Sequence, residues 1–235
     1  MSEKNKKLTK IVEEEIIEYI KKNHLEPGDK LKNEYELAEL LEVGRGTIRE
    51  AIKSLVSRNI LEVRQGAGTF VSSGNGIPED PLGLTMMEDD ENLALDTLAV
   101  RLLLEPEIAA MTAHKITDEQ LQELEEQCLL VEKLLMEGRD YKEEDARFHR
   151  KIGEFSGNRM IGNLVSVITS SVYLNVGGTK ARFKEQTVVE HRSILDALKR
   201  RDGAGAKYAM IAHLNTSREG LLNRVGETGD GTTEE

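Results

Sequence analysis

The chain of 235 residues has one cysteine, four prolines and no tryptophan. Cys128 has no second cysteine with which to form an internal disulfide, which is typical of a reducing compartment, here expected to be the cytoplasm. The charged N-terminal residues are not followed by an apolar run, so no signal peptide is expected. Hydrophobic residues nevertheless make up 38% of the chain, which is enough to build a core and excludes wholesale disorder.

A long hydrophobic run is also missing. Residues 160–179 carry no charge, but only ten of these twenty residues are clearly apolar. A membrane-spanning helix needs about 20 predominantly apolar residues. We therefore expect a helix buried inside a soluble protein, with some polar side chains turned toward a cavity, and no membrane partner.

Excess positive charge is absent, because 32 basic residues face 43 acidic ones and the net charge is −11. This excludes a basic coating for nucleic acid or anionic lipid over the whole protein. The charge is uneven, however. Residues 1–73 contain 13 basic and 13 acidic residues, so the acidic excess lies entirely in the rest of the chain.

Turn-forming residues stand where the charge changes, in the run SSGNGIP at 72–78. We therefore predict two domains, with a boundary in this run; the alternative is a long surface loop within one domain. The predicted limits are a first domain at 1–73, a linker at 74–81, a second domain at 82–225 and a flexible tail at 226–235.

The first domain is predicted to be a winged helix-turn-helix. Apolar spacing predicts a helix over 8–23, and Asn33 followed by Glu36 resembles the capping box of a short second helix. A third helix is expected from near Gly44 to Val56, and strands at 60–63 and 69–71 flank a glycine-containing loop. A short helix, a tight turn and a second helix place a helix in the major groove of DNA.

Arg45, Thr47 and Arg49 stand at the start of the third helix, where side chains reach base edges, and arginine can bind guanine through two hydrogen bonds. Gly66 and Gly68 permit a hairpin tip that lies close to a phosphate backbone. Residues 44–68 have a local net charge of +3 in a domain that is neutral overall. The alternative is a small helical domain with ordinary surface arginines.

The second domain is predicted to be an antiparallel bundle of helices, so the fold class is mainly α. Apolar periodicity and helix-ending residues predict helices over roughly 92–114, 118–137, 140–155, 158–176, 184–201 and 204–224. Their short connections imply antiparallel neighbours.

Four side chains of this domain form a candidate metal site. Asp145 and His149 are four residues apart and share one helix face, and His191 and His213 lie on two later helices. Three imidazoles and a carboxylate suit a borderline divalent ion, most often Zn²⁺, with Ni²⁺, Mn²⁺ or Co²⁺ as alternatives. The competing interpretation gives these residues surface or capping roles.

Arg101 stands in the apolar run from Leu98 to Leu104, where a charge is out of place. A buried arginine requires an anion beside it. That anion is either an internal carboxylate such as Glu105, four residues further on, or a carboxylate ligand held through two hydrogen bonds.

Residues 30–71 resemble the DNA-binding domain of GntR-family bacterial transcription regulators. The matching pieces are Arg45-x-Thr47-Ile48-Arg49-Glu50-Ala51 and Gly66-x-Gly68-Thr69-Phe70-Val71. The resemblance implies that Arg45, Thr47 and Arg49 contact operator DNA and that Gly66 lies near the wing tip. Asn33 and Tyr35 stand at two further positions of the DNA-binding motif, where the family commonly has Ser and Arg. Asn33 can keep the cap, whereas Tyr35 cannot make the contact of an arginine.

Residues 82–222 resemble the FCD domain, the effector-binding domain of FadR-type members of that family. The matching pieces are Asp96-x4-Arg101-x3-Glu105-Pro106, Asp145-x2-Phe148-His149, Ser156-Gly157-Asn158, Glu190-His191-x2-Ile194-Leu195 and Ala209-Met210-x2-His213-Leu214. The resemblance implies that Asp145, His149, His191 and His213 bind a metal ion. It also implies that Arg101 helps to hold a carboxylate effector, which points to a small organic or sugar acid.

The expected function is therefore regulation of transcription by a homodimer that reads double-stranded, pseudo-palindromic operator DNA. We expect a repressor of a catabolic operon that its effector releases from DNA; a ligand-activated activator is the alternative. A metal-dependent hydrolase or lyase could use the same Asp/His set, and a structural zinc site without an effector is a third alternative. No enzyme is expected, because the chain shows no HExxH, GxSxG or Walker pattern.

Overall fold

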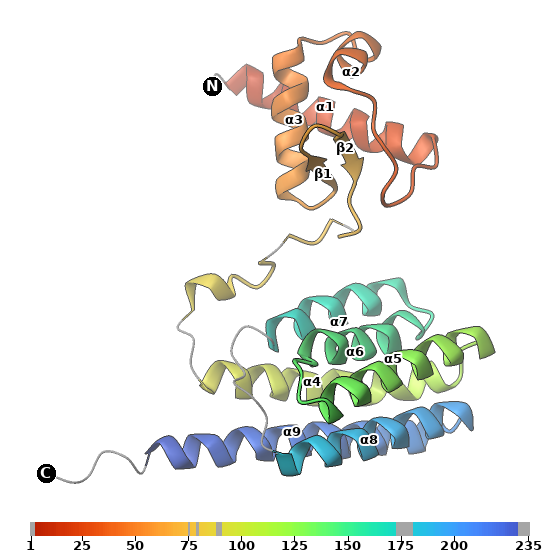
Figure 1. Cartoon of the computed structure of the whole chain (residues 1–235). Helices are drawn as coiled ribbons and strands as arrows, with labels where there is room; N and C mark the ends of the chain where they lie inside the picture. The colour runs from red at the N-terminus through yellow and green to blue at the C-terminus, as the bar shows by residue number, and fades with distance from the viewer. Residues whose placement is uncertain (1–2, 75, 79, 88–90, 173–180, 230–235) are drawn as a thin grey trace, which may run out of the picture. The chain divides into compact units, whose positions relative to one another are not determined.

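The computed structural model describes residues 3–74, 76–78, 80–87, 91–172 and 181–229 (Figure 1). The chain divides into two compact units, Met1–Pro81 and Leu82–Glu235. Each unit has a hydrophobic core of its own.

The first unit consists of three helices and a hairpin. Its elements are α1 (Glu3–Lys22), α2 (Glu34–Leu40), α3 (Arg45–Ser57), β1 (Leu61–Arg64) and β2 (Gly68–Val71). The two strands pair antiparallel. The predicted winged helix-turn-helix is confirmed in element type and order. The helix α1 begins at Glu3, before the predicted residue 8.

Local side-chain chemistry sets the start of α2. The side-chain oxygen of Asn33 accepts hydrogen bonds from the backbone N–H groups of Tyr35 and Glu36, each at 3.0 Å. In return, the carboxylate of Glu36 accepts one from the backbone N–H of Asn33 at 2.9 Å. This is the predicted capping box. The fully buried Leu37, Ile48 and Ile16 then join α2, α3 and α1 in one core.

The hairpin depends on two glycines in the left-handed region. Gly66 has φ 73° at the tip and Gly68 has φ 121° at the start of β2. A side chain at either position would strain the backbone. At Gly68 a Cβ would in addition lie 2.9 Å from Cε of Lys30.

The second unit contains a short 3-10 turn followed by six α-helices in the described residues (Figure 1). Its elements are η1 (Leu84–Met86), α4 (Glu91–Ala113), α5 (Asp118–Met136), α6 (Lys142–Glu154), α7 (Arg159–Val172), α8 (Ala181–Lys199) and α9 (Gly203–Gly229). The helix α4 packs against α6, α7, α8 and α9, while α5 packs against α6 and α8. The predicted all-helical unit is confirmed.

The predicted start of the tail differs from the structure. The tail was predicted to begin at residue 226, but α9 continues to Gly229. Gly226 keeps a helical backbone instead of the left-handed conformation that would end the helix. Residues 230–235 of the predicted tail, and residues 173–176 of the helix predicted over 158–176, lie outside the described residues.

The uncharged stretch forms most of α7, which buries Val165 and Ile168 in the core of the second unit. Within the described parts of the chain, no helix is long and apolar enough to cross a membrane.

A buried threonine connects α4 and α6. Oγ1 of Thr112 on α4 lies 2.7 Å from the carbonyl oxygen of Ile152 on α6.

The core of the second unit yields a stability prediction. Leu124 on α5 is fully buried, whereas Leu129 on the same helix is 54% exposed. Leu124→Ala should lower the free energy of unfolding by about 2–5 kcal/mol, because it leaves a cavity. Leu129→Ala, the matched control, should change it by about 0.5 kcal/mol or less. Urea unfolding of the full chain, followed by circular dichroism, measures both; equal losses would contradict the assignment of the core.

Candidate functional site

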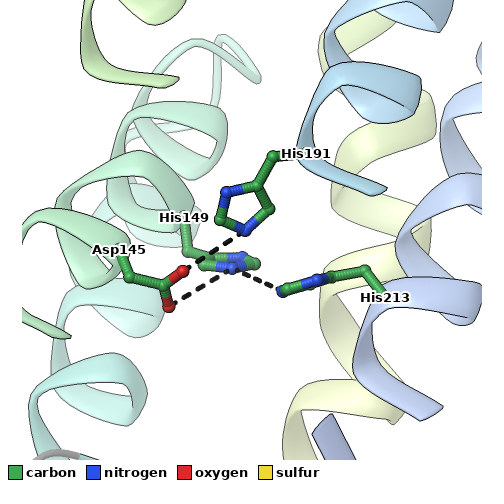
Figure 2. Close-up of side chains that lie close together, drawn as sticks. All are labelled: Asp145, His149, His191 and His213. Carbon is green, nitrogen blue, oxygen red and sulfur yellow. Dashed lines mark hydrogen bonds and ion pairs between the residues drawn. The ribbon is translucent and has the colours of Figure 1, made fainter. Parts of the chain in front are cut away.

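Three helices of the second unit bring four potential metal ligands together. Asp145 and His149 lie one turn apart on α6, His191 lies on α8, and His213 lies on α9 (Figure 2). One ligand atom from each residue lies within 4.8 Å of the others. All four residues that the sequence singled out therefore meet at one point.

The spacing of the facing atoms matches that of ligands around a single ion. Nε2 of His149 lies 3.2 Å from Nε2 of His213, and Nε2 of His191 lies 3.3 Å from Oδ1 of Asp145. An ion about 2.0–2.1 Å from its ligand nitrogens, in tetrahedral or octahedral geometry, places neighbouring donors about 2.8–3.4 Å apart. The arrangement can therefore hold one divalent ion.

Burial favours the neutral, metal-binding form of His149 and His191. The three rings are at most 2% exposed, and Asp145 is only partly buried. Burial lowers the pKa of His149, with partial opposition from the charge of Glu105. Burial and then the neighbouring imidazoles lower the pKa of His191 well below its usual value. A neutral imidazole offers a lone pair, which a metal ion requires.

One buried nitrogen tests whether these residues fit an ion. Among the described residues, four buried side-chain atoms lack a hydrogen-bond partner: Nε2 of His191, Nδ1 of His149, Nδ1 of His213 and Oε2 of Glu190. The last three lie in carboxylate–imidazole contacts, whereas Nε2 of His191 has Oδ1 of Asp145 3.3 Å away, within the candidate ligand set. Buried polar atoms are nearly always paired, so an unpaired one requires an explanation such as a bound ion. The ring of His191 also stacks on Phe148, with centroids 4.5 Å apart and planes inclined by 28°. The donor set therefore fits a metal ion.

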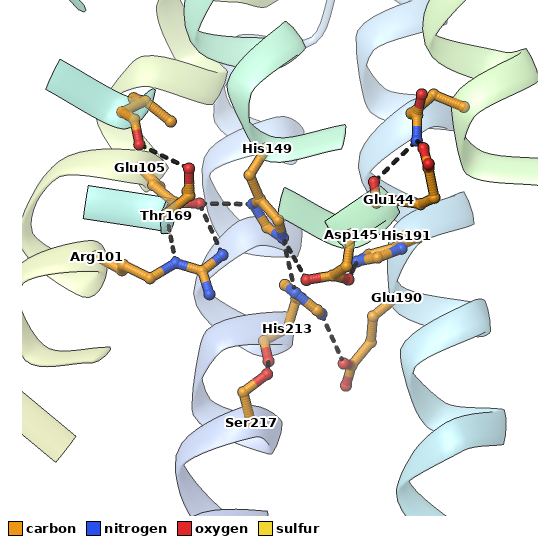
Figure 3. Close-up of polar contacts among 12 residues, drawn as sticks. Arg101, Glu105, Glu144, Asp145, His149, Thr169, Glu190, His191, His213 and Ser217 are labelled. Atoms are coloured by element: carbon orange, nitrogen blue, oxygen red, sulfur yellow. Dashed lines mark hydrogen bonds and ion pairs between the residues drawn. The ribbon is translucent and has the colours of Figure 1, made fainter. Parts of the chain in front are cut away.

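Carboxylates contact the outer nitrogens of two of the rings (Figure 3). Nδ1 of His149 lies 2.6 Å from Oε2 of Glu105, and Nδ1 of His213 lies 3.4 Å from Oε2 of Glu190. Oε1 of Glu190 also accepts a hydrogen bond from the Thr216 hydroxyl at 2.6 Å. Metal-binding histidines commonly have such a carboxylate behind them.

Arg101 takes the internal carboxylate as its partner. Its side chain is buried, and Nε lies 2.5 Å from Oε1 of Glu105 while Nη2 lies 3.3 Å from Oε2 (Figure 3). Burial alone would raise the pKa of Glu105, but the charge of Arg101 and the contact with His149 bring it below its usual range. Of the two partners considered from the sequence, the structure therefore shows Glu105.

The candidate DNA contacts lie on the surface of the first unit. Arg45 and Arg49 are exposed in the first turns of α3, and Thr47 between them is partly exposed. Tyr35 is 65% exposed, and Gly66 lies at the exposed tip of the hairpin. Asn33 is exposed too, but its side-chain oxygen is engaged in the cap of α2.

Arg49 forms a pair that the sequence analysis did not find. Its Nε and Nη2 donate to the two carboxylate oxygens of Glu34 on α2, at 3.2 and 2.8 Å. This hydrogen-bonded pair raises the pKa of Arg49 and lowers that of Glu34. The pair holds a guanidinium in the first turns of α3, where the sequence predicts contacts with DNA.

The sequence did not predict the contact of Glu190 with His213. It indicated Glu105 as a partner of Arg101, but not as a partner of His149. Glu190 directly precedes His191, which was the one available signal in the sequence. The other two histidines of the chain, His24 and His114, are exposed.

Comparison with known proteins identifies both units. Residues 8–71 match the family described as "Bacterial regulatory proteins, gntR family", and residues 96–216 match the FCD domain. The regulator LutR of Bacillus subtilis is 30% identical over 87% of this chain and 96% of its own length. The transcriptional repressor NanR of Cronobacter sakazakii is 27% identical over 90% of this chain and 84% of its own. The solved structure of a Streptococcus agalactiae GntR has 40% identity and a TM-score of 0.77, covering 90% of this chain and 99% of that one.

Proposed function

The chain belongs to the GntR family of bacterial regulatory proteins, and from that premise we propose that it is a repressor released from its operator by an organic acid. As a member of this family the chain is a DNA-binding transcriptional regulator and not an enzyme. The direction of regulation, the ion and the effector are the proposed parts. NanR, which is named as a repressor, supports the proposed direction.

The observation that carries the proposal is the convergence of Asp145, His149, His191 and His213 within the matched FCD domain. These residues would hold a divalent ion, with Zn²⁺ favoured and Ni²⁺, Mn²⁺ or Co²⁺ as alternatives. A bound ion supplies a Lewis acid to which an anion can bind.

An α-hydroxy carboxylic acid or a sugar acid would suit such a site, because its carboxylate and hydroxyl oxygens can both reach one ion. Arg101 is implied by family resemblance to contact this effector. Two of its nitrogens donate hydrogen bonds to the carboxylate of Glu105, so its contact with the effector stays a prediction.

The first unit would read DNA through Arg45, Thr47 and Arg49, with Asn33, Tyr35 and Gly66 close to the backbone. A homodimer places two such helices one turn of DNA apart, on a pseudo-palindromic site. The effector can change operator affinity only if it binds better to one arrangement of the dimer than to the other.

The DNA-reading residues are tested on a duplex that the protein selects from a random pool. Arg45→Ala and Arg49→Ala should each weaken binding to this duplex by about tenfold to a hundredfold, since a bidentate contact to a base contributes about 1–3 kcal/mol. Arg139→Ala, which removes an exposed arginine of the second unit, is the control and should bind as the wild type does. Gel-shift titrations at fixed salt measure all three; unchanged affinity in both α3 variants would overturn the assignment.

The metal site is tested by metal analysis after dialysis against Zn²⁺ and removal of free ion. The wild type should retain about one ion per chain, and His149→Ala should retain almost none, because one of four ligands is lost. His114→Ala removes an exposed histidine outside the set and should keep the ion. If the wild type retains none of Zn²⁺, Ni²⁺, Mn²⁺ or Co²⁺, the site holds no metal.

The direction of regulation is tested by adding L-lactate, L-malate or D-gluconate to the Zn²⁺-loaded protein on its selected duplex. At least one acid should release the DNA, and the same acid should have no effect on the metal-free protein. Tighter DNA binding with the acid would instead identify a ligand-activated regulator. If no α-hydroxy or sugar acid changes DNA binding, the proposal that such an acid is the effector is wrong.

A further inference from the structure

Arg101 and Glu105 form a buried pair on one face of α4, directly behind a proposed metal ligand. Both side chains are at most 5% exposed. One oxygen of Glu105 receives Nε of Arg101 at 2.5 Å, and the other lies 2.6 Å from Nδ1 of His149 (Figure 3). Side-chain contacts therefore lead from Arg101 through Glu105 on α4 to the ring of His149 on α6.

We propose that Glu105 is a positioning residue that directs Nε2 of His149 toward the ion, and that Arg101 acts by holding Glu105. This inference rests on the proposed metal site. It gives Arg101 a role inside the protein, which differs from the contact with a carboxylate effector that family resemblance implies.

The chemistry of the imidazole ring explains the effect. A neutral imidazole carries its proton on one nitrogen, and the other nitrogen then has the lone pair. Nδ1 lies 2.6 Å from Oε2 of Glu105, and a ring proton on Nδ1 facing this carboxylate leaves the lone pair on Nε2. Nε2 faces Nε2 of His213 at 3.2 Å and the carboxylate of Asp145. The contact thus selects both the tautomer and the rotation of the ring that an ion requires.

Arg101 restrains Glu105 through hydrogen bonds to its carboxylate. Its guanidinium contacts both oxygens, so the carboxylate has little freedom to rotate away from the ring. Glu190 behind His213 is held by different groups, the Thr216 hydroxyl and the Gln186 amide, and it lies farther from its ring, at 3.4 Å. Glu105 should therefore matter more for ion binding than Glu190.

The test measures Zn²⁺ affinity of the full chain by competition with a chromophoric chelator, with no organic acid present. Glu105→Gln should weaken Zn²⁺ binding about tenfold to a hundredfold, and Glu190→Gln should weaken it less. Glu107→Gln is the matched control, because Glu107 lies on the same helix and pairs with Lys207 on the surface. Arg101→Lys should also weaken Zn²⁺ binding, whereas an effector contact alone would leave it unchanged.

A second measurement separates positioning from a general loss of structure. Nitrogen-15 NMR of the metal-free protein should show His149 protonated on Nδ1 in the wild type and a shift toward protonation on Nε2 in Glu105→Gln. If Glu105→Gln does not fold, Glu105→Asp, whose carboxylate is one methylene shorter, replaces it in both measurements.

Wild-type Zn²⁺ affinity in both the Glu105 and the Arg101 variants would overturn the inference while leaving the metal site intact. A wild-type chain that binds no ion would instead remove the proposed metal site. The tautomer of His149 would then still report whether Glu105 orients the ring, so a wild-type ring protonated on Nε2 overturns the positioning role in either case.

Discussion

The burial of three imidazole rings in the core of the helical unit is the constraint on which that unit depends. Polar atoms removed from water destabilise a fold unless they find partners. His149 and His213 have carboxylates at their outer nitrogens, and His191 stacks on Phe148. With the outer side of the cluster supported in this way, the inner nitrogens and Asp145 face a common point, which is the geometry of an ion site.

The helix α4 contributes no ligand to this point but contacts what surrounds it. Arg101 and Glu105 hold the ring of His149, and Thr112 joins α4 to the backbone of α6. In the sequence, α4 is also the first long helix after the segment that leads from the DNA-binding unit. The helix α4 is thus both a support of the candidate ion site and the first α-helix of the second unit.

Features determined by a few neighbouring residues could be predicted from the sequence. The capping box of Asn33 and Glu36 spans one helical turn, and the glycines of the hairpin follow from local backbone geometry. The contacts of Glu34 with Arg49 and of Glu190 with His213 were missed, because each joins residues on different helices. No periodicity or spacing reports which carboxylate of an acidic chain lies behind which ring.

The sequence by itself determined the types and the order of the elements, since apolar periodicity and caps depend on neighbouring residues. It singled out the four residues of the candidate metal site as one of two interpretations, and resemblance to the FCD domain favoured the metal site. The tertiary structure decided that these four meet, and that Arg101 pairs with Glu105 on the same helix. The physical reason is that the burial of a charge and the distance between donors depend on how helices far apart in the chain pack together.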